Sequence, residues 1–188
     1  MNASHPNSEQ PLLTPQPPAG DEAKVAAILD AVQQNLGFVP DGLRLYSISP
    51  PLLEAFIANI SYFRGGTNLP PALTTMIRYL VSAKAHCQFC IDLNEGFLVH
   101  LGVDLDRARM ARNNPDLAPL QERERLLLKL ALRAVDNPDG ISAVDLDAAR
   151  AQGWDDRGIF DAVVQAANNR AFNHVLRTFK VEAQGVFA

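Results

Sequence analysis

The fold is decided by the segment PPALTTMIRYLVSAKAHCQFCIDLNEGFLVHL, which runs from Pro70 to Leu101. Two prolines open this segment, and apolar residues then recur every three or four positions, which is the period of an α-helix. Because proline is favoured in the first helical turn, this spacing predicts a helix from Ala72 to about Ala85. A second helix is predicted from Cys87 to Leu101, with Gly102 as its stop.

Both predicted helices have distinct faces, since residues three or four apart lie on the same side of a helix. The first helix has an apolar face of Leu73, Ile77, Leu80 and Val81, and a second face of Thr75, Tyr79, Ser82 and His86. The second helix places Cys90, Leu93, Phe97 and Leu101 on one face. The two cysteines of the chain therefore fall where one helix ends and the next begins.

The rest of the chain from Asp21 onwards keeps the helical period, and no strand pattern of comparable quality occurs. We therefore predict an all-α fold, a bundle in which short Pro/Gly connections make neighbouring helices antiparallel. The other predicted helices are Asp21–Leu36 with Asp21 as cap and Gly37 as stop, a short helix within Phe38–Ser49, a helix from Pro50 that ends at Gly65-Gly66, Asp104–Asn113, Leu120–Val135, Ser142–Gln152 and a last helix reaching Phe179.

The last helix carries a stripe of mostly apolar residues spaced three or four apart: Phe160, Val164, Ala167, Ala171, Val175 and Phe179. Small side chains on the same helix would allow another helix, in this chain or in a second copy, to approach closely. These small residues are Ala162, Ala166, Ala167 and Ala171.

Composition limits the classes of function. The 188 residues are 47% hydrophobic and 20% charged, with a net charge of −4, which is typical of a compact globular protein. The scattered basic residues form no stripe for nucleic acid or an anionic membrane, and no run approaches the roughly 18 apolar residues of a membrane span. We expect a Pro-rich arm over residues 1–20, a helical domain over residues 21–188, and, without a signal-peptide pattern, a cytoplasmic location.

Cys87 and Cys90 form a CxxC motif, and the chain has no other cysteine. Residues three apart at a helix start lie within disulfide reach, and the unpaired amides of a helix N-terminus lower the pKa of a nearby thiol. A redox pair is the favoured interpretation, with inert core thiols and zinc ligands as alternatives. Zinc ranks last because no second CxxC or HxxxH supplies further ligands, so we expect no metal and no resident cofactor.

The segment Pro70–Leu101 resembles the alkylhydroperoxidase D (AhpD)-like core of the carboxymuconolactone decarboxylase superfamily. The flanking sequence is similar to the peroxidase-related branch of that superfamily. The similar stretches are Leu36-Gly37-Phe38-Val39-Pro40, Ser49-Pro50, Leu52-Leu53-Glu54-Ala55-Phe56, Glu122-Arg123-Glu124, Ala148–Gly153 and Phe172-Asn173. The resemblance covers most of residues 21–181, and its chemically specific element is the CxxC.

The resemblance implies an all-helical subunit, assembled as a homo-oligomer, that reduces organic hydroperoxides and is recycled by an external dithiol or a reductase. It also implies that Cys90 is the peroxidatic nucleophile and that Cys87 resolves the sulfenic acid as a disulfide. Helix-dipole reasoning alone would not select Cys90, because the first cysteine of a CxxC is often the activated one.

The chain departs from the family at the groups that move protons. Family members with established peroxidase chemistry have a glutamate and a histidine where this chain has Thr75 and Asn94. As substitutes, His86 could supply a proton or pair with a thiolate, and Asn94 could donate a hydrogen bond to sulfur or peroxide.

This departure leaves alternatives open. The same cysteines could serve a general disulfide reductase or redox sensor, or the chain could be a scaffold that has kept the fold and lost the chemistry. A lactone decarboxylase is disfavoured, because that chemistry uses acid and base side chains and no CxxC.

Overall fold

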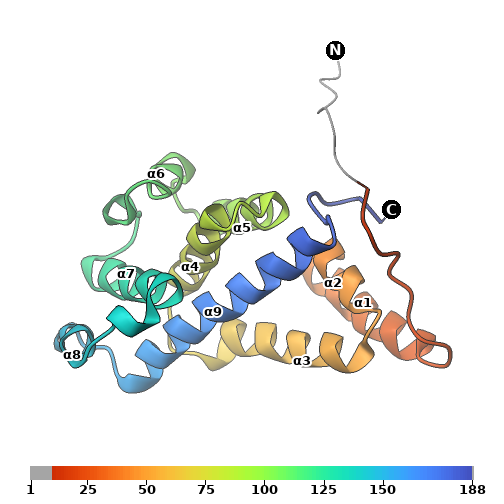
Figure 1. The fold of residues 1–188 in the computed structure, drawn as a ribbon, viewed down its shortest axis with the longest axis horizontal. Coiled ribbons are helices and arrows are strands. Elements are labelled where there is room, and N and C mark those ends of the chain that lie inside the picture. Colours follow the sequence, from red (N-terminus) through yellow and green to blue (C-terminus); the bar gives the residue numbers. More distant parts are fainter. Residues whose placement is uncertain (1–9, 188) are drawn as a thin grey trace, which may run out of the picture. The chain divides into compact units, whose positions relative to one another are not determined.

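The structure is a computed structural model that describes residues 10–187, and every regular element in that range is helical (Figure 1). The all-α prediction is therefore confirmed. Residues 1–9 of the predicted arm lie outside the described range. Between residues 10 and 187 no helix combines the length and the apolar character needed to cross a membrane. The α-helices are α1 (Glu22–Leu36), α2 (Asp41–Tyr46), α3 (Pro50–Ser61), α4 (Pro71–Lys84), α5 (Gln88–His100), α6 (Leu105–Met110), α7 (Glu122–Asp136), α8 (Ala143–Ala151) and α9 (Asp156–Thr178).

The helix boundaries follow the proline and glycine positions. Pro71 is in the first turn of α4, and α1 ends at Gly37, whose φ of 81° is the left-handed conformation that glycine adopts readily. After α3, a short π-helical turn ends at Gly66. Asp21 occupies the N-cap position of α1, but its carboxylate makes no capping hydrogen bond, so the predicted cap is wrong in its chemistry.

The chain divides into two compact units, Met1–Ser61 with Val175–Ala188 and Tyr62–His174. In the first unit, the core is built from α1, α2 and α3 through Val25, Val32, Leu43 and Leu53. The backbone N–H of Leu12, in the predicted arm, donates to the carbonyl of Phe179 of the same unit. The predicted division into an arm and one helical domain over residues 21–188 stays a prediction.

In the first unit, the buried carboxylate of Asp41 binds the backbone of the C-terminal segment. Asp41 is 1% exposed, and its Oδ2 accepts hydrogen bonds from the backbone N–H groups of Gly185 at 2.6 Å and Val186 at 2.7 Å. The backbone N–H of Asp41 donates to Gln184 Oε1 at 3.0 Å. Since buried carboxylates are costly unless they are hydrogen-bonded, this clamp fixes the segment after α9.

The second unit contains the CxxC and the larger apolar core. Helix α4 is buried along most of its length, through residues on both of its predicted faces. Residues of α5, α7, α8 and α9 complete this core. Its fully buried members include Leu73, Met76, Ile77, Tyr79, Leu98, Leu127, Leu128, Ala131, Ala149, Ala162 and Ala166.

Hydrogen bonds fix the register of α4 and α5. Arg78 contacts Asn94, and Tyr79 contacts Glu95, whereas Ser82, one turn further along α4, contacts Cys90, one turn earlier in α5. The two helices are therefore antiparallel, joined by the short link that contains His86. The buried side of α5 is formed by Cys90, Ile91, Asn94 and Leu98 rather than by the predicted face, on which Leu101 is 42% exposed.

Helix α9 buries a different face from the apolar stripe. Phe160 is 68% exposed and Ala167 and Ala171 are exposed, whereas Ala162 and Ala166 are fully buried in the core of the second unit. The buried face also carries four polar residues spaced four apart: Asp161, Gln165, Asn169 and Asn173. Three of the four find hydrogen-bond partners, which is why burial of a polar face is tolerated here.

Candidate functional site

The two cysteines form a compact pair at the start of α5. Cys87 is the N-cap residue of that helix, and Cys90 lies in its first turn. Their Sγ atoms are 2.7 Å apart, and the residues are 1% and 2% exposed. A disulfide requires an S–S distance of about 2.05 Å, so closing the bond needs only a small shift of the sulfurs. The spacing seen in the sequence thus places both thiols within direct reach of each other.

Two neutral polar side chains lie near the sulfur of Cys90. Ser82 on α4 and Asn173 on α9 are close enough to this sulfur to favour its ionised form. Ser82 Oγ accepts hydrogen bonds from Asn169 Nδ2 at 3.0 Å and from Asn173 Nδ2 at 3.1 Å. These bonds hold the hydroxyl in place, and it has one proton of its own to donate.

The environment of Cys90 raises the pKa of its thiol. The main cause is the adjacent Cys87 sulfur, followed by burial, because a second negative charge at this distance and a buried charge are both unfavourable. The nearby polar groups of Ser82 and Asn173 act in the opposite direction. Two thiols this close titrate as a pair, so the first ionisation leaves one proton shared between the two sulfurs.

Arg78 connects the two positions at which the family resemblance leads one to expect a glutamate and a histidine. Its Nη2 donates to Thr75 Oγ1 at 3.0 Å, and its Nε donates to Asn94 Oδ1 at 3.0 Å. The Asn94 Nδ2 in turn donates to the carbonyl of Cys90 at 2.7 Å. Burial lowers the pKa of Arg78 to about 10, so the guanidinium stays charged at neutral pH. The residues at the two expected acid and base positions therefore both bind one arginine.

This arrangement changes the role predicted for Asn94. We expected its amide to donate to sulfur or peroxide, but the amide donates to a backbone carbonyl and its oxygen holds Arg78. Asn94 is therefore placed beside the cysteine pair as a support for the backbone of Cys90 and for the guanidinium.

His86 lies directly before Cys87, in the link between α4 and α5. Its side chain is exposed, and its backbone has a φ of 54°, which is uncommon for a residue other than glycine. Its backbone N–H donates to the carbonyl of Ala83. The proton-supplying role of the imidazole stays a prediction.

A second polar cluster lies further along the α4–α5 pair. The carboxylate of Glu95 accepts from Tyr79 Oη at 2.9 Å, from Arg109 Nη2 at 2.7 Å and from Arg112 Nη2 at 2.6 Å. These bonds lower the pKa of Glu95, and burial raises the pKa of Tyr79 to about 12. The cluster ties α6 to α4 and α5, which is a structural role.

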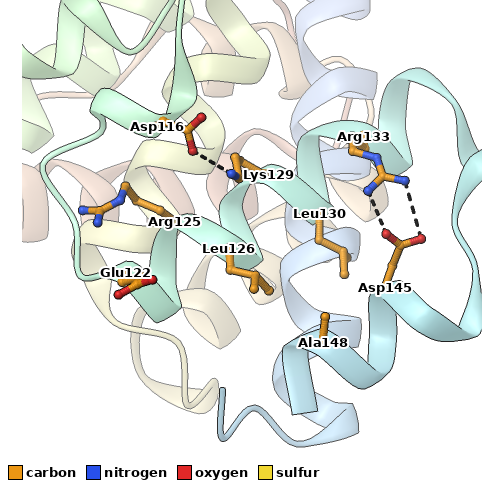
Figure 2. Close-up of a pocket in the computed structure, with 9 residues that line it drawn as sticks. All are labelled: Asp116, Glu122, Arg125, Leu126, Lys129, Leu130, Arg133, Asp145 and Ala148. Carbon is orange, nitrogen blue, oxygen red and sulfur yellow. Dashed lines mark hydrogen bonds and ion pairs between the residues drawn. The ribbon is translucent and has the colours of Figure 1, made fainter. Parts of the chain in front are cut away.

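The open pocket drawn in Figure 2 lies elsewhere in the second unit, at α7 and α8, and has a volume of about 710 Å³. Its walls carry ion pairs between Lys129 and Asp116 and between Arg133 and Asp145. Its lining includes neither cysteine nor any residue that contacts the pair. Four of the six charged residues that line the pocket are in these two ion pairs, and Glu122 and Arg125 are the other two.

Four residues of the site were not predicted as site residues: Arg78, Ser82, Asn169 and Asn173. Ser82 lay on the second face predicted for the first helix, and Asn173 belonged to a stretch that carries the family resemblance. For Asn169 and Asn173 a further signal existed, since polar residues recur every fourth position along α9. Arg78 gave no signal, because a single arginine within a helix is usually solvated.

Comparisons with known proteins agree with the fold. No protein-family model matches the chain, and no curated protein does. Among solved structures, an uncharacterized peroxidase-related protein from Silicibacter sp. TM1040 has a TM-score of 0.81 at 24% identity, over 95% of this chain and 93% of the other. An AhpD-core, uncharacterized peroxidase-related protein from Ralstonia eutropha JMP134 has a TM-score of 0.82 at 22% identity, over 98% and 96%.

The fold is also similar to that of a protein described as a debrominase. A cysteine-to-alanine variant of the debrominase Bmp8, in complex with 2,3,4-tribromopyrrole, has a TM-score of 0.74 at 19% identity, over 96% of this chain and 95% of the other. The same fold thus occurs with more than one described activity, and fold alone does not assign one. The chain has the fold of the AhpD-like, peroxidase-related proteins.

Proposed function

We propose that the protein is a thiol-dependent hydroperoxide reductase in which Cys90 attacks the peroxide and Cys87 resolves the product. The observation that carries this proposal is the pair itself: two buried sulfurs 2.7 Å apart, with the polar side chains of Ser82 and Asn173 near Cys90. Hydrogen-bond donors at a sulfur favour its thiolate, which is the reactive form. The AhpD-like fold supports the same chemistry.

In the first step, the singly ionised pair reacts through Cys90. The thiolate attacks the distal peroxide oxygen, the O–O bond breaks, and an alkoxide leaves while Cys90 becomes a sulfenic acid. The thiol of Cys87, at 2.7 Å from the reacting sulfur, gives its proton to the alkoxide and becomes a thiolate. The resolving cysteine thereby does the work of the missing acid–base relay.

In the second step, the Cys87 thiolate attacks the sulfur of the sulfenic acid, the S–O bond breaks, and hydroxide leaves and is protonated to water. The peroxide has then gained two electrons, and the pair has become a disulfide. An external dithiol returns the two electrons by thiol–disulfide exchange through a mixed disulfide.

A general disulfide reductase that uses the same pair is the second candidate. The observation in its favour is that Thr75 and Asn94, at the family's acid and base positions, hold Arg78 instead of moving protons. Exchange with a disulfide needs a thiolate, but it has no oxygen leaving group that must be protonated. It therefore depends less on an acid–base pair beside the cysteines.

The two candidates are separated by the rates of the reduced protein with an organic hydroperoxide and with a small linear disulfide, measured by stopped flow. A hydroperoxidase reacts with the peroxide much faster than a free thiol does, and its mass falls by two hydrogens. Fast exchange with the disulfide and a peroxide rate equal to that of a free thiol would establish the second candidate. Thiols inert to both reagents would indicate a scaffold.

A further inference from the structure

Some arginines of the second unit pair with carboxylates, whereas others, Arg78 among them, bond to neutral groups. Arg109, Arg112, Arg133 and Arg150 each form an ion pair with a carboxylate. Arg78 is half-buried, and within the described part of the chain its bonds run only to the oxygens of Thr75 and Asn94. Partly buried cations are normally paired with an anion, so this guanidinium lacks the partner that its surroundings call for.

The remaining donors of Arg78 are available to a ligand. Nε and Nη2 are used by Asn94 and Thr75, which hold the plane of the guanidinium, and no hydrogen bond to Nη1 occurs among residues 10–187. A guanidinium held rigidly by two neutral acceptors is suited to an anion with planar geometry, above all a carboxylate.

A second group without a partner lies on α9, which packs against α4. Gln165 is 5% exposed, and its Oε1 is the one buried side-chain polar atom between residues 10 and 187 that has no hydrogen-bond partner. Asn169, one turn later on α9, donates to the carbonyl of Arg78 and to Ser82, so α9 and α4 advance in the same direction. This register places Gln165 at the level of Thr75, one turn from Arg78.

We propose that Arg78 anchors a carboxylate, so that the substrate of the cysteine pair is a carboxylated organic hydroperoxide, with Gln165 accepting a hydrogen bond from the bound molecule. The peroxide part of this inference rests on the proposed function. The carboxylate anchor at Arg78 is independent of that function, because the anchor would bind a carboxylate whether or not a peroxide reacts. A buried polar group without a hydrogen-bond partner calls for an explanation, and a bound ligand that supplies the partner is one.

The test compares two matched substrates, 4-carboxycumene hydroperoxide and its neutral carboxamide, with the reduced wild-type protein. We expect the carboxylate to react about ten to a hundred times faster at low concentration, as a charge-assisted bond would provide. Arg78→Met removes this preference, and Arg78→Lys restores part of it. Arg150→Met, which removes an exposed arginine of α8, leaves the preference unchanged. Equal wild-type rates for the two substrates would overturn the anchor.

Binding of an unreactive carboxylate, 4-isopropylbenzoate, separates this inference from the peroxidase proposal. Calorimetry with the reduced protein is expected to show binding in the wild type and in Arg150→Met, and its loss in Arg78→Met. Binding that depends on Arg78 without any peroxide reaction would refute the peroxidase and retain the anchor. A peroxide reaction without a preference for the carboxylate, and without binding of 4-isopropylbenzoate, would refute the anchor and retain the peroxidase. Arg78→Lys, expected to weaken binding, provides a second variant if Arg78→Met does not fold. Gln165→Leu should slow the carboxylated hydroperoxide, whose O–H is the donor that Gln165 accepts, and should leave the binding of 4-isopropylbenzoate unchanged.

Discussion

Removal of the Ser82 hydroxyl tests the polar network around Cys90. Ser82→Ala deletes a group that accepts from Asn169 and Asn173 and lies near Cys90. At about 1 kcal/mol for each of these two bonds, less a few tenths regained from the helix propensity of alanine, the free energy of unfolding falls by about 1.5–2 kcal/mol.

The same change slows the thiol reaction. We expect the hydroxyl to donate to the Cys90 thiolate once it forms. A hydrogen bond to a charged acceptor is stronger than one to a neutral acceptor by about 1–1.5 kcal/mol, so removal of the hydroxyl should raise the thiol pKa by about one unit. The thiolate fraction at neutral pH, and with it the rate with hydroperoxide, should then fall about tenfold.

The assays are urea unfolding and stopped-flow reaction with cumene hydroperoxide. Thr74→Val is the matched control, because Thr74 is buried on the same helix and its hydroxyl donates to the carbonyl of Pro71, away from the cysteines. This control should lose about 1 kcal/mol of stability and keep the wild-type rate. A folded Ser82→Ala protein that reacts at the wild-type rate would refute the role assigned to this hydroxyl.

Other perturbations test separate parts of the structure. His86→Gly should raise the free energy of unfolding by about 0.5–1 kcal/mol, because it relieves the left-handed φ of 54°; a loss of stability on urea unfolding would contradict this. Because the pKa of Cys90 is raised on folding, its contribution to stability is present below the ordinary thiol pKa of about 8.5 and is lost as pH rises above it. The free energy of unfolding of the reduced protein, measured at successive alkaline pH values, should therefore fall more steeply in the wild type than in Cys90→Ala. The difference should be up to about 1.4 kcal/mol per pH unit, and equal slopes would argue against the raised pKa. Glu95→Gln should lower stability by about 2 kcal/mol, because it weakens the bonds to two arginines, and an unchanged melting temperature would exclude that role. Asp41→Ala should expose the segment after α9 to carboxypeptidase, and digestion at the wild-type rate would show that the clamp is unimportant.

The sequence alone was enough to predict the helical fold and the cysteine pair, because both depend on local signals. Proline at a helix start and glycine at a helix end act through φ and the missing N–H, which do not depend on the rest of the chain. Pro71 and Gly37 mark helix ends for this reason. The spacing of Cys87 and Cys90 within one helical turn likewise required no tertiary information.

The buried face of α9 could not be found from hydrophobicity. A search for apolar periodicity selects Phe160, Ala167 and Ala171, which are exposed, and passes over the polar residues that face the core. Asn169 and Asn173 are buried because Ser82 and the carbonyl of Arg78 accept their protons, and those partners are about 90 residues away in the chain. Only the packing of α9 against α4 brings the groups together.

Arg78 could not be predicted for a related reason. The resemblance directed attention to Thr75 and Asn94 as missing catalytic groups, but it could not show that both would hold one guanidinium. Helix α4 is buried along most of its length, so its pattern of apolar residues does not show whether Arg78 faces the protein or the solvent.

The most direct test of the proposed chemistry is to locate the first oxidised sulfur. Cys87→Ser, treated with one equivalent of hydroperoxide, should stop at a sulfenic acid that is trapped by dimedone and maps to Cys90, whereas Cys90→Ser should react no faster than a free thiol and the wild type should form the Cys87–Cys90 disulfide. Rapid formation of a trapped sulfenic acid on Cys87 in the Cys90→Ser protein would contradict the assignment and reverse the roles of the two cysteines.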